Sequence, residues 1–163
     1  VHVVLGPSGR HRPGMHDDQR IGPGRHPGQA RIGEAADVVD PGGAHLTGLC
    51  RRAVAAGVDP ARLVIDPGIG FGKTVRDNLA LLDGVDHLRR LGHPVLVGPS
   101  RKRFVSVVAG TDPTDVAARD DASVGACVLA AVRGADLVRV HEVAAVRRAL
   151  AVVDAAVRPS TGG

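Results

Sequence analysis

The sequence contains very few aromatic residues and very few lysines. Two Phe, no Trp and no Tyr leave no platform on which nucleic-acid bases could stack. The formal net charge is +4, but the basic residues are scattered along the chain, so we discount nucleic-acid binding. Only Lys73 and Lys102 are lysines, and all other basic residues except His are Arg. In a chain this rich in Arg, each of the two lysines is a candidate for a position that needs a compact ammonium instead of a guanidinium. The alternative is that the lysines were retained by chance.

Cysteines and long hydrophobic runs are also scarce. Cys50 and Cys127 lie far apart in helical patterns, which favours reduced core thiols over a disulfide or a metal site. The sequence has no run of eighteen apolar residues and no basic-then-apolar leader. We therefore expect a cytoplasmic protein without a membrane partner. The early histidines show no zinc-like spacing with the cysteines, which argues against metal binding by His2, His11, His16, His26 and His45.

The first 45 residues differ from the rest of the chain. They are rich in Gly, Pro, His and Arg and show no regular period after Val3-Val4-Leu5. Three interpretations of residues 1–45 remain open: a disordered arm, a linker, or a segment translated in the wrong reading frame. We expect residues 46–157 to form the folded part and residues 158–163 to be a frayed tail.

From residue 46 onward, short apolar runs alternate with helical patterns. A helix that ends at Gly57 precedes a strand at 62–66, whose Leu63, Val64 and Ile65 indicate burial on both faces. The later segments are expected as a helix at 79–91, a strand at 94–98, a helix at 120–133, a strand at 137–141 and a helix at 143–157. This order predicts an α/β fold with a parallel sheet. Periodicity leaves two architectures open: three to four units of a (β/α)8 barrel, or a small open doubly wound sheet.

All three predicted strands end in polar residues: Asp66, then Ser100 with Lys102, then Arg139 with His141. The carboxyl ends of parallel strands share one edge of the sheet, so we expect these side chains to converge. Arg139 and His141 stand two positions apart, project to one face, and suit an anion such as a diphosphate. The alternative is a pair of residues satisfied by backbone carbonyls.

The stretch from Asp66 to Thr74 is a glycine loop, which we define as residues 66–74. A phosphate-binding P-loop would need Gly six residues before its Lys, but that position is Pro67, and dinucleotide-type glycine spacing is also absent. Thr74 and Asp77 predict a helix N-cap with its capping box. Asp66 suits a flat nitrogen heterocycle with adjacent N–H donors, or it caps the loop by accepting backbone amides.

Three motifs together resemble the dihydropteroate synthase family. They are Asp-Pro-Gly-Ile-Gly-Phe-Gly-Lys at 66–73, Gly-Pro-Ser-Arg-Lys at 98–102 and Arg-Val-His-Glu at 139–142. The resemblance covers about residues 46–157. It implies the last three to four β/α units of a (β/α)8 TIM barrel, following an irregular N-terminal segment. It further implies a transferase of folate biosynthesis that condenses 6-hydroxymethyl-7,8-dihydropterin diphosphate with 4-aminobenzoate, releasing diphosphate, and a homodimer for the complete enzyme.

The resemblance also implies roles for individual residues. The pterin would be bound by Asp66, Gly70 and Lys102. The aminobenzoate would be bound by Phe71, Ser100 and Arg101. The diphosphate would be bound by Arg139 and His141.

Some features of the family are not found in this sequence. The family implies Mg²⁺ held by an Asn from the first half of the barrel, but no Asn precedes Asn78, so no metal ligand is assigned. Pro99 stands where a smaller or polar residue is expected. The sequence therefore indicates a fragment of the enzyme, and the alternative is a non-catalytic remnant or a pterin- or phosphate-binding module.

Overall fold

The computed structural model describes residues 2–5 and 32–157, and it describes side chains from residue 42 to residue 157. The elements follow in this order: β1 (His2–Leu5), α1 (Ile32–Ala55), the 3-10 helix η1 (Pro60–Arg62), α2 (Val75–Asp83), α3 (Val85–Arg89), β2 (Leu96–Val97), α4 (Arg103–Ala109), α5 (Val116–Val132), β3 (Leu137–Val140) and α6 (Val143–Val157). The predicted α/β alternation is confirmed. None of the described helices is long and apolar enough to cross a membrane.

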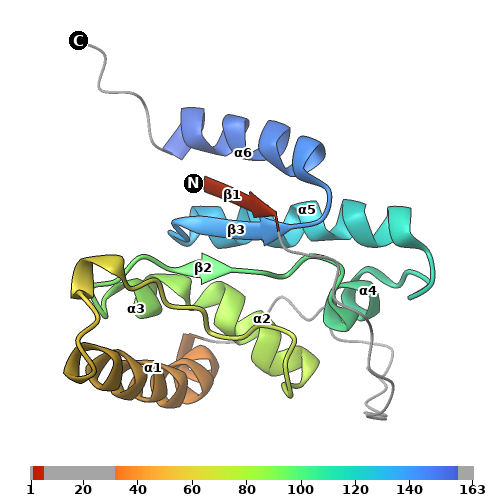
Figure 1. Cartoon of the computed structure of the whole chain (residues 1–163). Helices are drawn as coiled ribbons and strands as arrows, with labels where there is room; N and C mark the ends of the chain where they lie inside the picture. The colour runs from red at the N-terminus through yellow and green to blue at the C-terminus, as the bar shows by residue number, and fades with distance from the viewer. Residues whose placement is uncertain (1, 6–31, 158–163) are drawn as a thin grey trace.

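The strands form a parallel sheet, as the alternation predicts. Its order is β1-β3-β2, with β3 in the centre. Beside β2, a single parallel bridge between Ile65 and Val95 adds an extended segment. All three strand arrows point to the same side, toward α4 (Figure 1). The carboxyl ends of the strands therefore lie along one edge.

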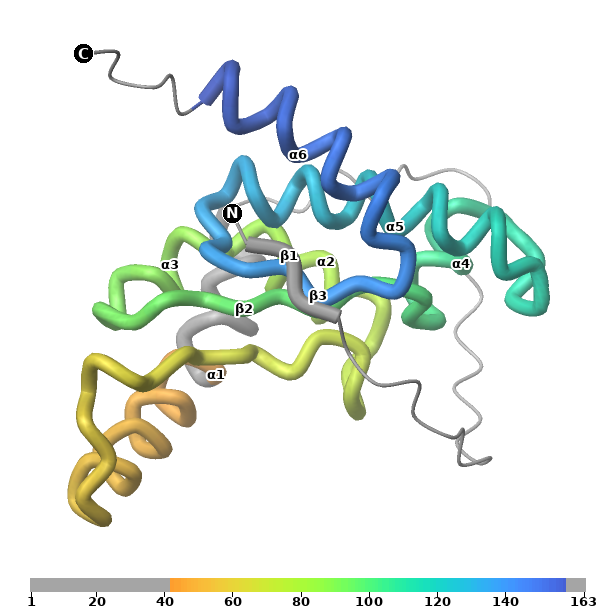
Figure 2. The backbone as a smooth tube through the Cα atoms, turned by 45° about the horizontal axis from the view of Figure 1, so that its top comes forward, coloured from red at the N-terminus to blue at the C-terminus, as the bar shows by residue number. Residues whose placement is uncertain are grey.

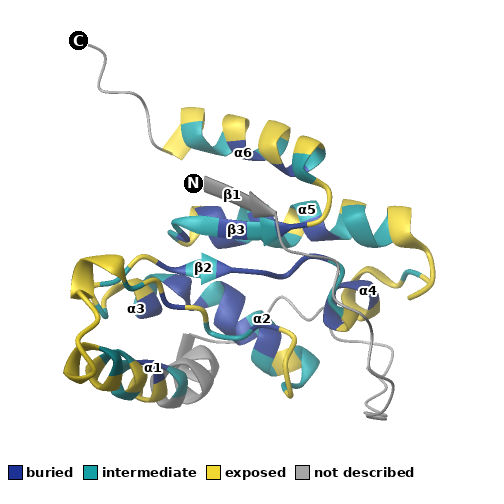
Figure 3. Cartoon of the chain, viewed as in Figure 1, coloured by how far each residue is buried: buried dark blue, intermediate teal, exposed yellow. Residues whose placement is uncertain are grey.

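Burial alternates along β3 and differs between the two faces of the sheet. Val138 and Val140 are buried, whereas Leu137 and Arg139 are half-buried. The buried face joins a core that includes Leu81, Leu88, Cys127 and Val146 from the surrounding helices. Figure 3 shows the buried residues on the sheet and on the helix surfaces around it. Each fully buried Val side chain contributes about 1.5–3 kcal/mol, so this face holds the helices in place.

The helices surround the strands rather than forming a separate layer at one end. In Figure 1 the sheet lies between α6 above and α1 below. Helix α5 packs against α4, α6 and β3, while α1 packs against α2 and α3. The tube in Figure 2 follows the same succession of strand, helix and returning strand from another angle. This arrangement leaves the carboxyl ends of the strands next to α4 and the start of α5.

The predicted strand at 62–66 is wrong in extent and in burial. Residues 60–62 form η1, and within residues 62–66 only Ile65 makes a bridge. Ile65 is 3% exposed, but Val64 is 50% exposed. Among the described residues, the segment is bridged only to Val95, directly before β2, and the Ile65 side chain packs into the core. Apolar character at three consecutive positions therefore overstated the burial.

The prediction that residues 1–45 are irregular is wrong for two parts of that segment. Residues 2–5 form β1, and α1 begins at Ile32 instead of near residue 46. Pro41, Gly42 and Gly43 lie within this helix despite their low helix propensity. The contacts of α1 with α2 and α3 outweigh that local preference, which is only a weak guide. The remaining residues of this segment and the predicted tail at 158–163 lie outside the described residues.

Three helix boundaries also differ from the pattern. Gly84 divides the expected helix at 79–91 into α2 and α3 and caps both. Helix α4 follows directly after Lys102, in a stretch for which the sequence predicted no helix. Helix α5 starts at Val116, with the side chain of Asp115 accepting the N–H of Ala118 as its N-cap, so it begins before the expected residue 120.

Candidate functional site

The glycine loop is held mainly by its own residues. Oδ1 of Asp66 accepts the N–H of Gly68 at 2.8 Å, so the predicted capping role of this carboxylate is realised. Asp66 is nevertheless exposed, and an ionised carboxylate has further acceptor sites. Nζ of Lys73 donates to the carbonyl oxygens of Gly68 and Phe71 at 2.9 and 3.2 Å. A compact ammonium with several donors suits this position inside a tight loop.

Asn78 connects the loop to helix α2 and was not predicted as a site residue. It is 2% exposed. Its Oδ1 accepts the N–H of Gly70 at 2.6 Å, and its Nδ2 donates to the carbonyls of Lys73 and Thr74 at 3.3 and 2.7 Å. The predicted capping box of Thr74 and Asp77 is confirmed. Loop and helix therefore form one hydrogen-bonded unit.

Lys102 lies across this loop, although it comes from the end of a different strand. Its Nζ is 3.5 Å from the centre of the Phe71 ring, a cation–π contact. A Cβ added at Gly70, where φ is 80°, would lie 2.5 Å from Cδ of Lys102. Only glycine allows this approach. Burial, with a smaller effect from Arg139, lowers the pKa of Lys102, while Asp66 acts in the opposite direction.

Ser100 and His141 join the ends of β2 and β3. Oγ of Ser100 lies 2.9 Å from Nδ1 of His141 and accepts the backbone N–H of His141 at 3.2 Å. Burial, followed by the nearby Arg101 cation, lowers the pKa of His141, whereas Asp120 acts in the opposite direction. The imidazole is therefore neutral near pH 7. If Nδ1 accepts the Ser100 hydroxyl proton, the ring proton resides on Nε2.

Arg139 lies beside the same strand end. Its guanidinium packs against the backbone of Gly98, where an added Cβ would be 3.4 Å from both Nε and Nη2. Its charge contributes to the lowered pKa of Lys102, so the two cations lie near each other. Two neighbouring cations of this kind are suited to binding an anion.

Arg101 is engaged within the chain rather than exposed in the site. Its Nε and Nη2 donate to the two carboxylate oxygens of Asp120 at 2.7 and 2.8 Å. This bidentate pair lowers the pKa of Asp120 and raises the pKa of Arg101. The N–H of Arg101 donates to Oγ of Ser123 at 2.9 Å, and Nη2 of Arg119 donates to the Arg101 carbonyl.

Comparison with known proteins fits this arrangement. Residues 18–141 match the family described as pterin binding enzyme. The chain belongs to the pterin-binding enzyme family. It is 48% identical over 124 residues to the dihydropteroate synthase of Mycobacterium leprae. The aligned part covers 73% of this chain and 43% of that protein. It is 43% identical over 103 residues to the dihydropteroate synthase of Bacillus subtilis, covering 63% of this chain and 35% of that protein.

Solved structures of pterin-binding enzymes have the same fold over the matched part. The dihydropteroate synthase of Xanthomonas albilineans in complex with 7,8-dihydropteroate is 39% identical, with a TM-score of 0.71, over 96% of this chain and 51% of that chain. The dihydropteroate synthase of Thermus thermophilus in complex with 4-aminobenzoate is 47% identical, with a TM-score of 0.66. The match covers 76% of this chain and 47% of that chain. The chain thus spans about half the length of these relatives or less.

The structure brings most of the expected pterin-family site residues together. Lys102 contacts Gly70 and Phe71, Ser100 contacts His141, and Arg139 lies near Lys102. Arg101 differs, because its guanidinium is held by Asp120. Sequence reasoning missed the residues that organise these groups, namely Asn78, Arg119, Asp120 and Ser123. A buried Asn directly after the glycine loop could have been suspected, but the α5 residues carry no local signal.

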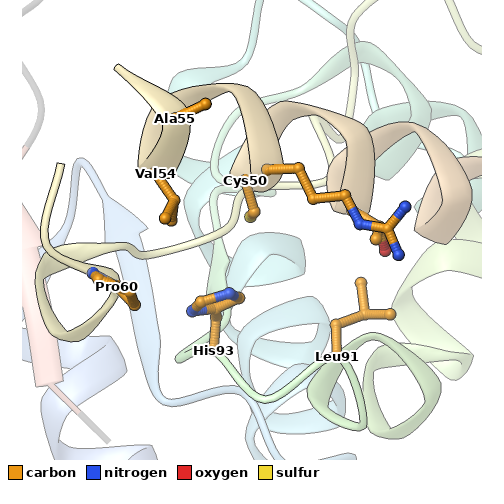
Figure 4. Close-up of a pocket in the computed structure, with 8 residues that line it drawn as sticks. Cys50, Val54, Ala55, Pro60, Leu91 and His93 are labelled. Atoms are coloured by element: carbon orange, nitrogen blue, oxygen red, sulfur yellow. The ribbon is translucent and has the colours of Figure 1, made fainter. Parts of the chain in front are cut away.

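Among the described residues, neither a candidate metal centre nor the cavity drawn in Figure 4 lies at this edge. Within the described residues, no group of three or more His, Cys, Asp or Glu side chains could hold a metal ion. A cavity of about 390 Å³ lies between α1, η1 and the turn after α3 (Figure 4). It is lined by Thr47, Cys50, Arg51, Val54, Ala55, Pro60, Leu91 and His93. Pro60 and His93 precede the extended residues at Ile65 and in β2. The cavity therefore lies at the amino ends of these two segments, whereas Asp66 and Ser100 lie at their carboxyl ends.

Proposed function

We propose that this chain is the carboxyl-side part of a dihydropteroate synthase. The reaction joins 6-hydroxymethyl-7,8-dihydropterin diphosphate to 4-aminobenzoate and gives 7,8-dihydropteroate and diphosphate. The observation that carries the proposal is the convergence of the glycine loop, Lys102, Ser100, His141 and Arg139 at one edge of a parallel sheet. Relatives of 39–47% identity bound to 7,8-dihydropteroate and to 4-aminobenzoate support the choice of ligands.

The pterin is assigned to Asp66, Gly70 and Lys102. The exposed Asp66 carboxylate retains acceptor sites beyond its bond to Gly68 and suits adjacent N–H donors on a flat heterocycle. Gly70 lets the Lys102 chain approach the loop backbone, which brings the ammonium to the same place. Together these groups fix the orientation of the ring.

The diphosphate is assigned to Arg139 and His141, and the aminobenzoate to Phe71 and Ser100, with Arg101 nearby. Arg139 supplies a permanent charge, and His141 supplies a donor at Nε2 when Nδ1 accepts from Ser100. Phe71 is 60% exposed and presents an apolar ring surface. The Asp120 contacts of Arg101 leave it less available to the aminobenzoate carboxylate than the family resemblance implies.

The chemical step needs positioning more than a covalent intermediate. The aminobenzoate nitrogen forms a bond to the pterin methylene carbon while the bond from that carbon to diphosphate oxygen breaks. The diphosphate leaves with the electron pair, and the amine loses a proton. Holding the reactants in line and stabilising the departing anion with Arg139 and His141 favours this step. No step is assigned to magnesium.

We further propose that residues 46–157 are the last three to four units of a (β/α)8 barrel, and that the complete enzyme is a cytoplasmic homodimer. The parallel sheet with surrounding helices and the likeness to solved dihydropteroate synthases support the first part. The open doubly wound sheet receives no such support.

Two binding and activity measurements test the function. Calorimetric titration of the chain with the pterin diphosphate is expected to give saturable binding. A diphosphate-release assay with 4-aminobenzoate then separates an active enzyme from the second candidate, a non-catalytic remnant that binds pterin or phosphate. Turnover by this chain alone would exclude the remnant, whereas binding without turnover would favour it.

A further inference from the structure

Arg101 has an unusual backbone conformation. Among the described residues, it is the only non-glycine residue with a positive φ, at 56°. A left-handed conformation is unfavourable for a residue with a Cβ, because the Cβ lies too close to the following carbonyl oxygen. Such a conformation persists only when its surroundings hold it. The contacts of Arg101 therefore explain why the turn at residues 99–102 has its shape.

Three residues of α5 hold both the backbone and the side chain of Arg101. We call them the Arg101 anchor: Arg119, Asp120 and Ser123. Asp120 binds the guanidinium through two bonds, Ser123 accepts the backbone N–H, and Arg119 donates to the backbone carbonyl. Ser123 is 1% exposed, and its hydroxyl also donates to the Arg119 carbonyl at 2.6 Å. The anchor is thus internally connected, and Arg119 and Asp120 are half-buried.

The two neighbours of Arg101 are site residues. Ser100 contacts His141, and Lys102 lies over Gly70 and Phe71. Arg101 lies between these two residues, and a displacement of its backbone would break one or more of the anchor contacts. We infer that Asp120, with Ser123 and Arg119, is a positioning residue that sets where Ser100 and Lys102 lie in the site. Arg101 then acts as the internal partner of Asp120 and not as a ligand for the aminobenzoate carboxylate. The ligand-binding part of this inference rests on the proposed function.

The test uses the whole chain and the Asp120→Asn variant. Asp121→Asn is the matched control, because Asp121 is an exposed carboxylate on the same helix and makes none of the anchor contacts. Asp120→Glu keeps the carboxylate and is the conservative rescue. Since Lys73 and Lys102 are the only lysines, NMR of the lysine Cε groups follows just two side-chain signals.

The first readout is the titration of Lys102 without any ligand. Burial, Arg139 and Asp66 are the causes acting on its pKa, and Asp120 is not among them. A change in Asp120→Asn therefore reports a displaced Lys102 and not a lost charge next to it. We expect the lowered pKa of Lys102 to rise toward its ordinary value in Asp120→Asn and to remain as in the wild type in Asp121→Asn and Asp120→Glu. An unchanged pKa in Asp120→Asn would overturn the inference.

The second readout is the affinity for the pterin diphosphate, measured on the same variants. The pterin diphosphate should bind about fivefold more weakly to Asp120→Asn than to the wild type, because Lys102 is displaced, and should bind to Asp120→Glu and Asp121→Asn as it does to the wild type. Equal weakening in Asp121→Asn would indicate a general structural defect and would overturn the positioning role. Unchanged affinity for the pterin diphosphate, despite a shifted Lys102 pKa, would also overturn it.

Two further outcomes are covered by the design. If Asp120→Asn does not fold, Ser123→Ala removes the acceptor of the Arg101 N–H and the hydroxyl donor to the Arg119 carbonyl, and it should shift the Lys102 pKa in the same direction. If the wild-type chain does not bind the pterin diphosphate, the proposed function fails for this chain. The Lys102 titration still decides whether the anchor positions the turn, so the two failures are distinguishable.

Discussion

The glycine loop and the turn at residues 99–102 contribute to one site but are stabilised in different ways. The loop bonds to residues close in sequence: Asp66 to Gly68, Lys73 to Gly68, and Asn78 to Gly70. The turn bonds to residues 18 to 41 positions away, on α5 and at the end of β3. A locally bonded segment keeps its shape largely on its own, whereas the turn depends on the packing of α5 against the sheet.

Asn78 offers the strongest way to break the locally bonded region. Asn78→Ala leaves the N–H of Gly70 without its acceptor and removes the side-chain donor to the carbonyls of Lys73 and Thr74, although the Thr74 carbonyl still accepts the backbone N–H of residue 78. We expect the free energy of unfolding to fall by about 2–4 kcal/mol, measured by urea denaturation. Asp77→Ala at the adjacent position removes one capping bond and should lower it by only about 0.5–1 kcal/mol. Equal losses in the two variants would show that Asn78 does not organise the loop.

Gly70 links the two regions, and Gly72 provides its matched control. Both glycines have positive φ, but an added Cβ at Gly72 meets nothing within 4 Å, whereas at Gly70 it meets Lys102. Each substitution by Ala should destabilise the fold by about 1–2 kcal/mol through the backbone. Only Gly70→Ala should also displace Lys102, which NMR of its Cε group would detect. A Lys102 signal that stays unchanged in Gly70→Ala would contradict the close approach.

Lys73 tests whether the local bonding needs a compact ammonium. Lys73→Arg keeps the charge, but a planar guanidinium fits less well between the carbonyls of Gly68 and Phe71. We expect a loss of about 1 kcal/mol in the free energy of unfolding and no change in the Asp120 titration. A variant as stable as the wild type would mean that this lysine was retained by chance.

The smallest effect is expected from lowering the pH, which weakens the pair between Arg101 of the turn and Asp120 of α5. The hydrogen bonds from Arg101 lower the pKa of Asp120. The pair therefore stabilises the fold fully at pH values above the ordinary Asp pKa of about 3.9. That contribution is lost as the pH falls through the lowered folded-state pKa. In Arg101→Gln, a carboxyl-carbon NMR titration should show the pKa of Asp120 rising toward its ordinary value. An unaltered titration would remove Arg101 as the cause.

The same contrast explains what the sequence could predict. The capping box of Thr74 and Asp77 and the helix at 143–157 were predicted because their signals lie within a few residues. The positioning role inferred for Asp120 and Ser123 was not, because their partner Arg101 is 19 and 22 residues away and no local pattern marks the pair. Long-range contacts of this kind depend on how α5 packs, which periodicity does not specify.

The residue roles follow the same division. Motifs at three strand ends indicated which residues to consider, and the structure brings Lys102, Gly70 and Phe71 into contact, as well as Ser100 and His141. The exposure of Val64 was missed because an apolar triplet does not reveal whether a neighbouring strand covers it. The assigned roles in binding pterin, aminobenzoate and diphosphate remain predictions.

Binding of the pterin diphosphate to the wild type and to Lys102→Ala tests most directly whether the two regions form one site. Lys102 belongs to the distantly bonded turn yet contacts Phe71 and Gly70 of the locally bonded loop. Calorimetric titration should give saturable binding to the wild-type chain and about tenfold weaker binding to Lys102→Ala, since a charge-assisted contact is lost. Equal affinity in the two proteins would contradict a shared site.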